Sequence, residues 1–366
     1  MAQTDLDPII AAFQSKDYKT AARLIKPLLQ RSPPDPGVLL YAAKLQAIAN
    51  HSEAAERYYR QVLQATTNPK LAMQARQGLE QLEQQIQDQR RQAIAAATAD
   101  PDHSKPGFLI LEAIAPDQRQ TAAQHFARIF KLDPYTARFQ MPNRGWRLYR
   151  MGAIGELQVY GQELRDVGIP AFWQPLDAVR QLHVFRVQYF QDLSAQPTVI
   201  CQNEHGQTGA LSFDWSEVTQ RVKGLLPIFE QVVDLDSRRQ VRRKDATQDY
   251  AQVYDLHIPG RNSIVRFCDY TYQFQAGVMF EDDAAMGERS LRLSWNRLSQ
   301  FLDQTLDAIP LWSDFTPFAE SAINQLDLVM GLPHYLDLLR KAESTWDPAF
   351  HLYSSLVFLY NLSRSS

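Results

Sequence analysis

The stretches Asp17-Tyr18-Lys19-Thr20-Ala21 and His51-Ser52-Glu53-Ala54-Ala55 decide the fold of the N-terminal quarter of the chain. They place the small residues Ala21 and Ala55 inside the same local pattern. Apolar residues at helical spacing and then a proline follow each alanine: Ile25, Leu28, Leu29 and Pro33 after the first, and Tyr59, Val62, Leu63 and Pro69 after the second. A small residue where two helices cross, with a trailing proline, predicts a helix-turn-helix unit that stacks on its neighbour.

The separation of Ala21 and Ala55 equals the period of a tetratricopeptide repeat, and residues 3–92 resemble that family. The resemblance implies two repeats, with a polar helix over 71–86 as a terminal cap, and a module that holds another polypeptide. The family's aromatic and Leu-Gly of the first helix are absent, because Leu39, Ala42 and Ala43 fill those places. We expect an apolar partner segment to be gripped on the first helix of the second repeat. The candidate partner-binding residues there are Leu40, Tyr41, Lys44 and Ala47.

Residues 93–107 are predicted to be a linker, followed by a small α/β domain over 108–175. Its pattern reads strand, helix, helix, strand, helix, strand. Asp133-Pro134 begins the short second helix, with the acid as cap, and Gly168 ends the third. This order resembles, in outline, the C-terminal domain of the bacterial ribosomal stalk protein.

From residue 180 to 310 the hydrophobic period changes to two, which predicts antiparallel strands joined by hairpins and closed by an amphipathic helix. In outline this segment resembles a pleckstrin-homology-like (PH-like) domain. Residues 214–250 have no assigned place in it. Residues 311–366 are predicted to be C-terminal helices packed on the body, and the last one is apolar almost all round, so we expect it to be buried. The predicted fold class is therefore α+β multidomain.

Composition limits the classes of function. The 366 residues are enough for two or three domains with cores, and the net charge of −3 argues against direct binding of nucleic acid. The N-terminus lacks the pattern of a signal peptide, and no apolar stretch is long enough to span a membrane. We therefore expect a cytoplasmic protein, with attachment to the periphery of a membrane complex left open.

Arginines supply the candidate ligand contacts. Arg144, Arg147 and Arg150 lie beside Trp146 and Tyr149, an arrangement that can bind a phosphate or stack on a base. The densest basic run is 238–244, with the candidates Arg238, Arg239, Arg242 and Arg243, although flanking aspartates reduce its field. Ordinary strand-edge charge and a solvated loop are the alternatives for these two groups.

Motifs for catalysis, metal ions and cofactors are absent. The eight histidines are scattered, the two cysteines form no metal pattern, and no glycine-rich phosphate loop or Gly-x-Ser-x-Gly elbow occurs. Asp255 and His257 share one strand face, where a structural pair is expected and an oriented base is the alternative. We expect no enzyme activity, no cofactor and no metal site.

Three functional hypotheses follow. The first is a non-catalytic adaptor or assembly factor that holds a protein partner, such as a membrane-associated or large multisubunit complex, through the repeat module. The second is a sensor that binds a small phosphorylated ligand or nucleotide in the body, and the third is an enzyme. The glutamine-rich composition with repeats at the front resembles repeat proteins common in cyanobacteria, which implies a role in the assembly of large complexes.

Overall fold

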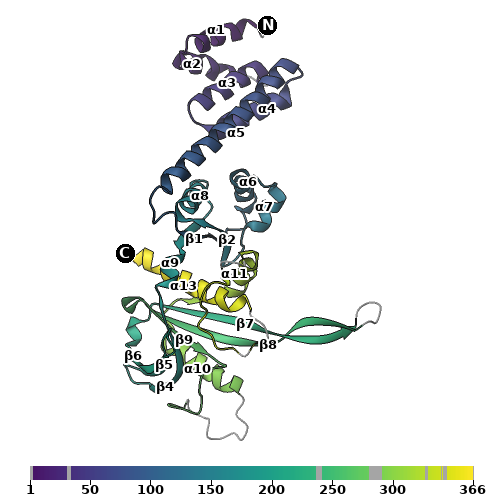
Figure 1. Cartoon of the computed structure of the whole chain (residues 1–366). Helices are drawn as coiled ribbons and strands as arrows, with labels where there is room; N and C mark the ends of the chain where they lie inside the picture. Colours follow the sequence, from purple (N-terminus) through teal and green to yellow (C-terminus); the bar gives the residue numbers. More distant parts are fainter. Residues whose placement is uncertain are drawn as a thin grey trace. The chain divides into compact units, whose positions relative to one another are not determined.

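The computed structural model describes residues 3–30, 34–235, 241–279, 291–325, 329–338, 340 and 344–365. It confirms a mixed α+β protein with N-terminal helices, two sheets and C-terminal helices (Figure 1). The chain divides into two compact units, Met1–Ala96 and Ala97–Ser366. The predicted segments 108–175, 180–310 and 311–366 all lie in the second unit, so they share one compact body.

The N-terminal unit consists of helices: α1 (Gln3–Gln14), α2 (Tyr18–Leu28), α3 (Pro36–Ile48), α4 (Ser52–Ala65) and α5 (Pro69–Ala97). Its first four helices form two hairpins with matching turns. The turn residues Lys16 and Asn50 both have φ of 58°. The N–H of the residue after each one donates to the carbonyl five positions back, at 2.8 and 2.9 Å. Ala21 and Ala55, both 0% exposed, lie at the fourth position of α2 and α4. The backbone geometry of the two hairpins thus repeats with the same spacing as these two alanines.

The body begins with a three-stranded antiparallel sheet in the order β2-β1-β3. Its strands are β1 (Pro106–Glu112), β2 (Trp146–Ala153) and β3 (Ala171–Pro175), and its helices are α6 (Arg119–Phe130), α7 (Pro134–Gln140), α8 (Ile154–Asp166) and α9 (Leu176–Arg180). Side chains of β1 alternate between two cores. Leu109 and Leu111 pack in the core of α6 and α8, whereas Phe108 and Ile110 pack in the core that includes the C-terminal helices.

A seven-stranded sheet follows, in the order β10-β7-β8-β9-β4-β5-β6. Its strands are β4 (His183–Asp192), β5 (Thr198–Gln202), β6 (Thr208–Ser212), β7 (Gln220–Leu235), β8 (Val241–Ile258), β9 (Ser263–Cys268) and β10 (Leu311–Trp312). Short 3-10 turns lie at Trp215–Glu217, Pro259–Arg261 and Ile323–Gln325. The remaining helices are α10 (Leu291–Thr305), α11 (Phe315–Ala322) and α13 (Trp346–Ser365).

This sheet corrects two predictions for 180–310. The strands are not all antiparallel, because β4 pairs with β9, and β10 with β7, in parallel. The sheet is open, with β10 and β6 at its ends, so the resemblance to a closed PH-like domain does not hold for the described residues. The unassigned segment 214–250 supplies most of the long β7–β8 hairpin, whose outer part has only two strands and extends beyond the sheet (Figure 1).

Helix α13 lies between the two sheets, and α10 covers the other face of the larger one (Figure 1). Residues 347–358 of α13 are buried without interruption, which confirms the prediction of a buried last helix. On one side its Tyr360 packs on Trp146 of β2, with ring centroids 5.0 Å apart. On the other side Phe350 packs over Gly224 of β7, where a Cβ atom would come within 2.4 Å of the ring. The helix therefore joins both sheets into one core.

We predict that Gly224→Ala destabilises the body by about 1–3 kcal/mol, because the added methyl group overpacks the Phe350 ring. Gly209→Ala is the matched control, since Gly209 also lies in a strand and a Cβ atom added there would have no neighbour within 4 Å. All six tryptophans lie between residues 146 and 346, so urea unfolding followed by tryptophan fluorescence reports on the body alone. Equal midpoints for the two variants would contradict the proposed packing constraint.

Candidate anion-binding pocket

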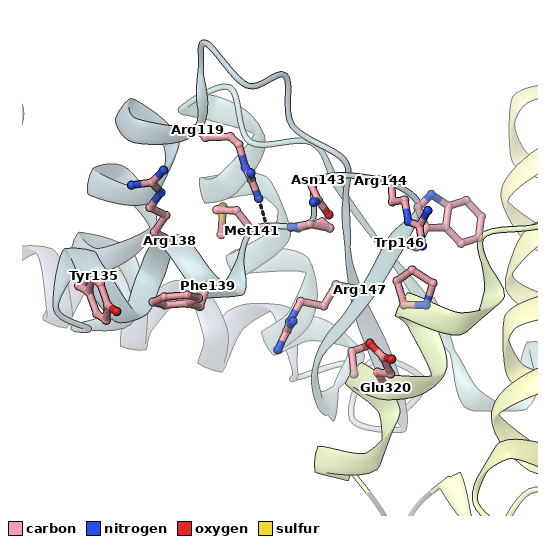
Figure 2. Close-up of a pocket in the computed structure, with 13 residues that line it drawn as sticks. Arg119, Tyr135, Arg138, Phe139, Met141, Asn143, Arg144, Trp146, Arg147 and Glu320 are labelled. Carbon is pink, nitrogen blue, oxygen red and sulfur yellow. Dashed lines mark hydrogen bonds between the residues drawn. The ribbon is translucent and has the colours of Figure 1, made fainter. Parts of the chain in front are cut away.

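A pocket of about 480 Å³ opens where the small sheet meets α11. It is built by the start of α6, by α7, by the loop that leads into β2, and by α11. Figure 2 shows the side chains that line it, among them Arg119, Arg138, Arg144 and Arg147. Its volume lies in the range of small-molecule sites. Because α11 follows β2 in the sequence only after all strands of the larger sheet, this concavity exists only in the folded body.

The described lining residues include four arginines and one carboxylate, that of Glu320. No ion pair joins any of these five side chains within the described part of the chain. Arg119 donates one hydrogen bond from Nη2 to the carbonyl of Met141 at 3.0 Å, while its buried Nε has no partner among the described residues. Burial lowers the pKa of Arg147 below its usual range. The pocket thus carries an excess of positive charge that its own residues do not neutralise.

Two aromatic rings stand on the α7 side of this pocket. Tyr135 and Phe139, four residues apart on α7, are 73% and 62% exposed. Their ring centroids are 4.8 Å apart in an edge-to-face arrangement. Figure 2 shows Arg119 and Arg147 between this pair and Arg144. Large apolar rings that remain exposed beside a concavity mark a surface suited to a planar or apolar ligand group.

Sequence reasoning found only part of this site. Arg144 and Arg147 line the pocket, as their candidacy requires, but Arg150 does not. Arg150 is instead 2.6 Å from the carboxylate of Glu156 and lies over the ring of Tyr160. Arg119 and Arg138 were missed. The pattern Tyr135, Arg138, Phe139 on one short helix was the available signal.

The other basic candidates are not among the described residues that line this pocket. Arg238 and Arg239 lie outside the described residues, and only the backbone of Arg242 and Arg243 is described. These two residues pair with Asp234 and Val233 across the β7–β8 hairpin.

The predicted partner-binding residues lie on α3. Leu40 is 1% exposed and belongs to the helical core, so its prediction as a contact residue was wrong. Tyr41 is half-buried against Phe13 at 5.0 Å, and the ammonium of Lys44 lies 5.1 Å from the Tyr41 ring. Ala47 packs partly against the same core as Leu40. Tyr41 and Lys44 keep exposed surface, and Ile48, one turn further, is 50% exposed.

Asp255 and His257 meet a third polar group, Ser354 of α13. The Ser354 hydroxyl donates to Asp255 Oδ2 at 2.6 Å, and it lies 3.0 Å from His257 Nε2. Asp255 also accepts two hydrogen bonds from Arg266, at 2.9 and 2.7 Å. All three members of the Asp–Ser–His set are 0% exposed. A nucleophilic triad needs an accessible hydroxyl and a carboxylate that orients the histidine, and this buried cluster has neither.

Comparison of the chain with protein-family models, with curated proteins and with solved structures gave no match. Among the described residues, no group of three or more His, Cys, Asp and Glu side chains could hold a metal ion. No described helix has the length and apolar character needed to cross a membrane. Function is therefore inferred from the chain's own residues.

The buried histidine gives a pH prediction. Burial lowers the pKa of His257 from 6.5 to about 4, so the unfolded state takes up a proton first as pH falls. The contribution of His257 to stability is present above pH 6.5 and is lost as pH falls toward 4. Between pH 7 and pH 5 this amounts to about 2 kcal/mol. His351 changes the stability with pH in the same direction, because burial lowers its pKa also. Asp269 changes the stability with pH in the opposite direction, because burial raises its pKa to about 6.

The test compares urea unfolding at pH 7 and pH 5 for the wild type and His257→Asn, which removes the titrating group. We expect the variant to lose about 2 kcal/mol of the pH dependence. His205→Asn, at an exposed turn, is the control and should keep the wild-type dependence. An unchanged dependence in His257→Asn would show that this histidine is not buried in its neutral form.

Proposed function

We propose that this protein is a non-catalytic binding protein whose body recognises an anionic, phosphate-bearing ligand. The observation that carries the proposal is that four arginines line one pocket with a single carboxylate, and that no ion pair joins these side chains among the described residues. Guanidinium groups match phosphate oxygens in geometry and form strong, charge-assisted hydrogen bonds with them.

We predict that tripolyphosphate raises the thermal midpoint of the body. A ligand at 100 times its dissociation constant stabilises the folded state by about 2.7 kcal/mol. Arg147→Met keeps most of the side-chain volume and removes a central guanidinium, so it should abolish most of this shift. Arg180→Met removes an exposed arginine outside the pocket and should retain it. Equal shifts in both variants would place phosphate binding elsewhere.

A second candidate function is that of an adaptor or assembly factor, in which the N-terminal unit holds a polypeptide. It is favoured by the two successive hairpins that share the same turn geometry, as stacked repeats do. We propose the α3 stripe of Tyr41, Lys44 and Ile48 as its contact surface. Under this proposal the protein is cytoplasmic, and its partner belongs to a large complex, at a membrane or free.

The adaptor function predicts that full-length Lys44→Glu loses a protein that the wild type retains from native lysate. The reversed charge lies beside Tyr41 on the proposed surface, whereas Lys70→Glu reverses an exposed charge at the start of α5 and should behave as wild type. Retained proteins are identified by mass spectrometry, and each is then purified and titrated directly. If both variants retain the same proteins with the same affinity, the α3 stripe is not a binding surface.

A further inference from the structure

We propose that the ligand of the arginine pocket is a nucleoside polyphosphate. Its phosphates would lie on Arg119, Arg144 and Arg147, and its base would stack on the aromatic pair of α7. This inference rests on the proposed function of phosphate recognition and adds the base to it. Three observations support it: the arginines lie next to exposed aromatic rings, the pocket is larger than one phosphate group and has a polar amide in its lining, and α11 covers the adjacent edge of the small sheet.

The first reason is the pairing of charge with exposed rings. Arginine alone would serve any phosphate, but Tyr135 and Phe139 stay largely exposed next to the arginines, where a compact inorganic anion gives them no contact. A purine or pyrimidine is planar and offers a π-face to such rings. Arg138, which lies on α7 between the two aromatics in sequence, adds a guanidinium plane that can also stack on a base.

The second reason is the size and the polar lining. The pocket of about 480 Å³ fits within the range for small-molecule ligands and exceeds what one phosphate group fills. The exposed side chain of Asn143 lines it as well, and its amide offers both a donor and an acceptor. Ribose hydroxyls and base edges both donate and accept hydrogen bonds, and the amide of Asn143 can satisfy either kind of group, whereas arginine only donates.

The third reason argues against a phosphopeptide that adds to the edge of the small sheet. A peptide that adds to a sheet edge needs free backbone groups on that edge. Beside the pocket, the edge strand β2 is covered by α11: the N–H of Leu148 donates to the hydroxyl of Ser321 at 3.0 Å. That hydroxyl in turn donates to the carbonyl of Phe318 at 2.6 Å. The edge is thus occupied at this position, which favours a compact ligand.

The test is calorimetric titration of the full chain with ATP, with tripolyphosphate and with adenosine. We expect ATP to bind at least about fivefold more tightly than tripolyphosphate, because stacking of one base on an aromatic side chain supplies that difference. Phe139→Ala should bring the ratio toward one while leaving the affinity for tripolyphosphate unchanged. Phe139 is 62% exposed, so this variant should fold. Tyr250→Ala, which removes a partly exposed ring outside the pocket, should keep the wild-type ratio.

The outcomes separate the two proposals. Equal affinities for ATP and tripolyphosphate, both reduced about tenfold or more by Arg147→Met, would overturn the nucleotide and leave phosphate recognition standing. If neither ATP nor tripolyphosphate binds, both the nucleotide proposal and the phosphate proposal are overturned. A single-stranded oligonucleotide that binds more tightly than ATP, and that depends on Phe139, would overturn the free nucleotide in favour of a nucleic acid.

Discussion

The burial of α13 between two sheets is the constraint on which the rest of the body depends. A helix enclosed on both sides must satisfy its polar side chains within the protein. Ser354 does so by donating a hydrogen bond to Asp255. Asp255 also forms an ion pair with Arg266, and the two side chains are 0% and 1% exposed. Loss of one partner from such a pair costs about 3–5 kcal/mol, because the other charge stays buried and unpaired. Few arrangements of the helix on the large sheet meet this requirement.

The burial of α13 also positions the elements that form the pocket. Trp146, the first residue of β2, packs on Tyr353 and Tyr360 of α13, with ring centroids 5.9 and 5.0 Å apart. The preceding loop and the start of β2 carry Arg144 and Arg147, so the buried helix fixes the position of these charges. Ser321 then ties α11 to β2. A site held in this way keeps its backbone in place before a ligand arrives, which lowers the entropic cost of binding.

Local chemistry predicted the elements that short-range rules govern. Asp133 caps α7 by accepting from the N–H of Thr136, and Gly168, with φ of +80°, follows the end of α8 as expected. Pairing between distant strands was not predictable in this way. Hydrophobic alternation is the same for parallel and antiparallel neighbours, so it could not show that β4 pairs in parallel with β9, which follows it only after β5, β6, β7 and β8. The prediction of Leu40 as a contact residue met a similar limit, because helical spacing alone does not distinguish a core position from a position on the binding groove.

The pocket shows why a site is harder to predict than a strand. The arginine cluster beside Trp146 was visible in the sequence, but the partners of each arginine were not: Glu156 neutralises Arg150, whereas Arg147 has no such partner among the described residues. Positive charges without a counter-charge and exposed aromatic rings each lower the stability of the protein without ligand. Both occur together in this pocket. A bound anion with an aromatic ring would relieve both costs at once, and neither part of the ligand alone would do so.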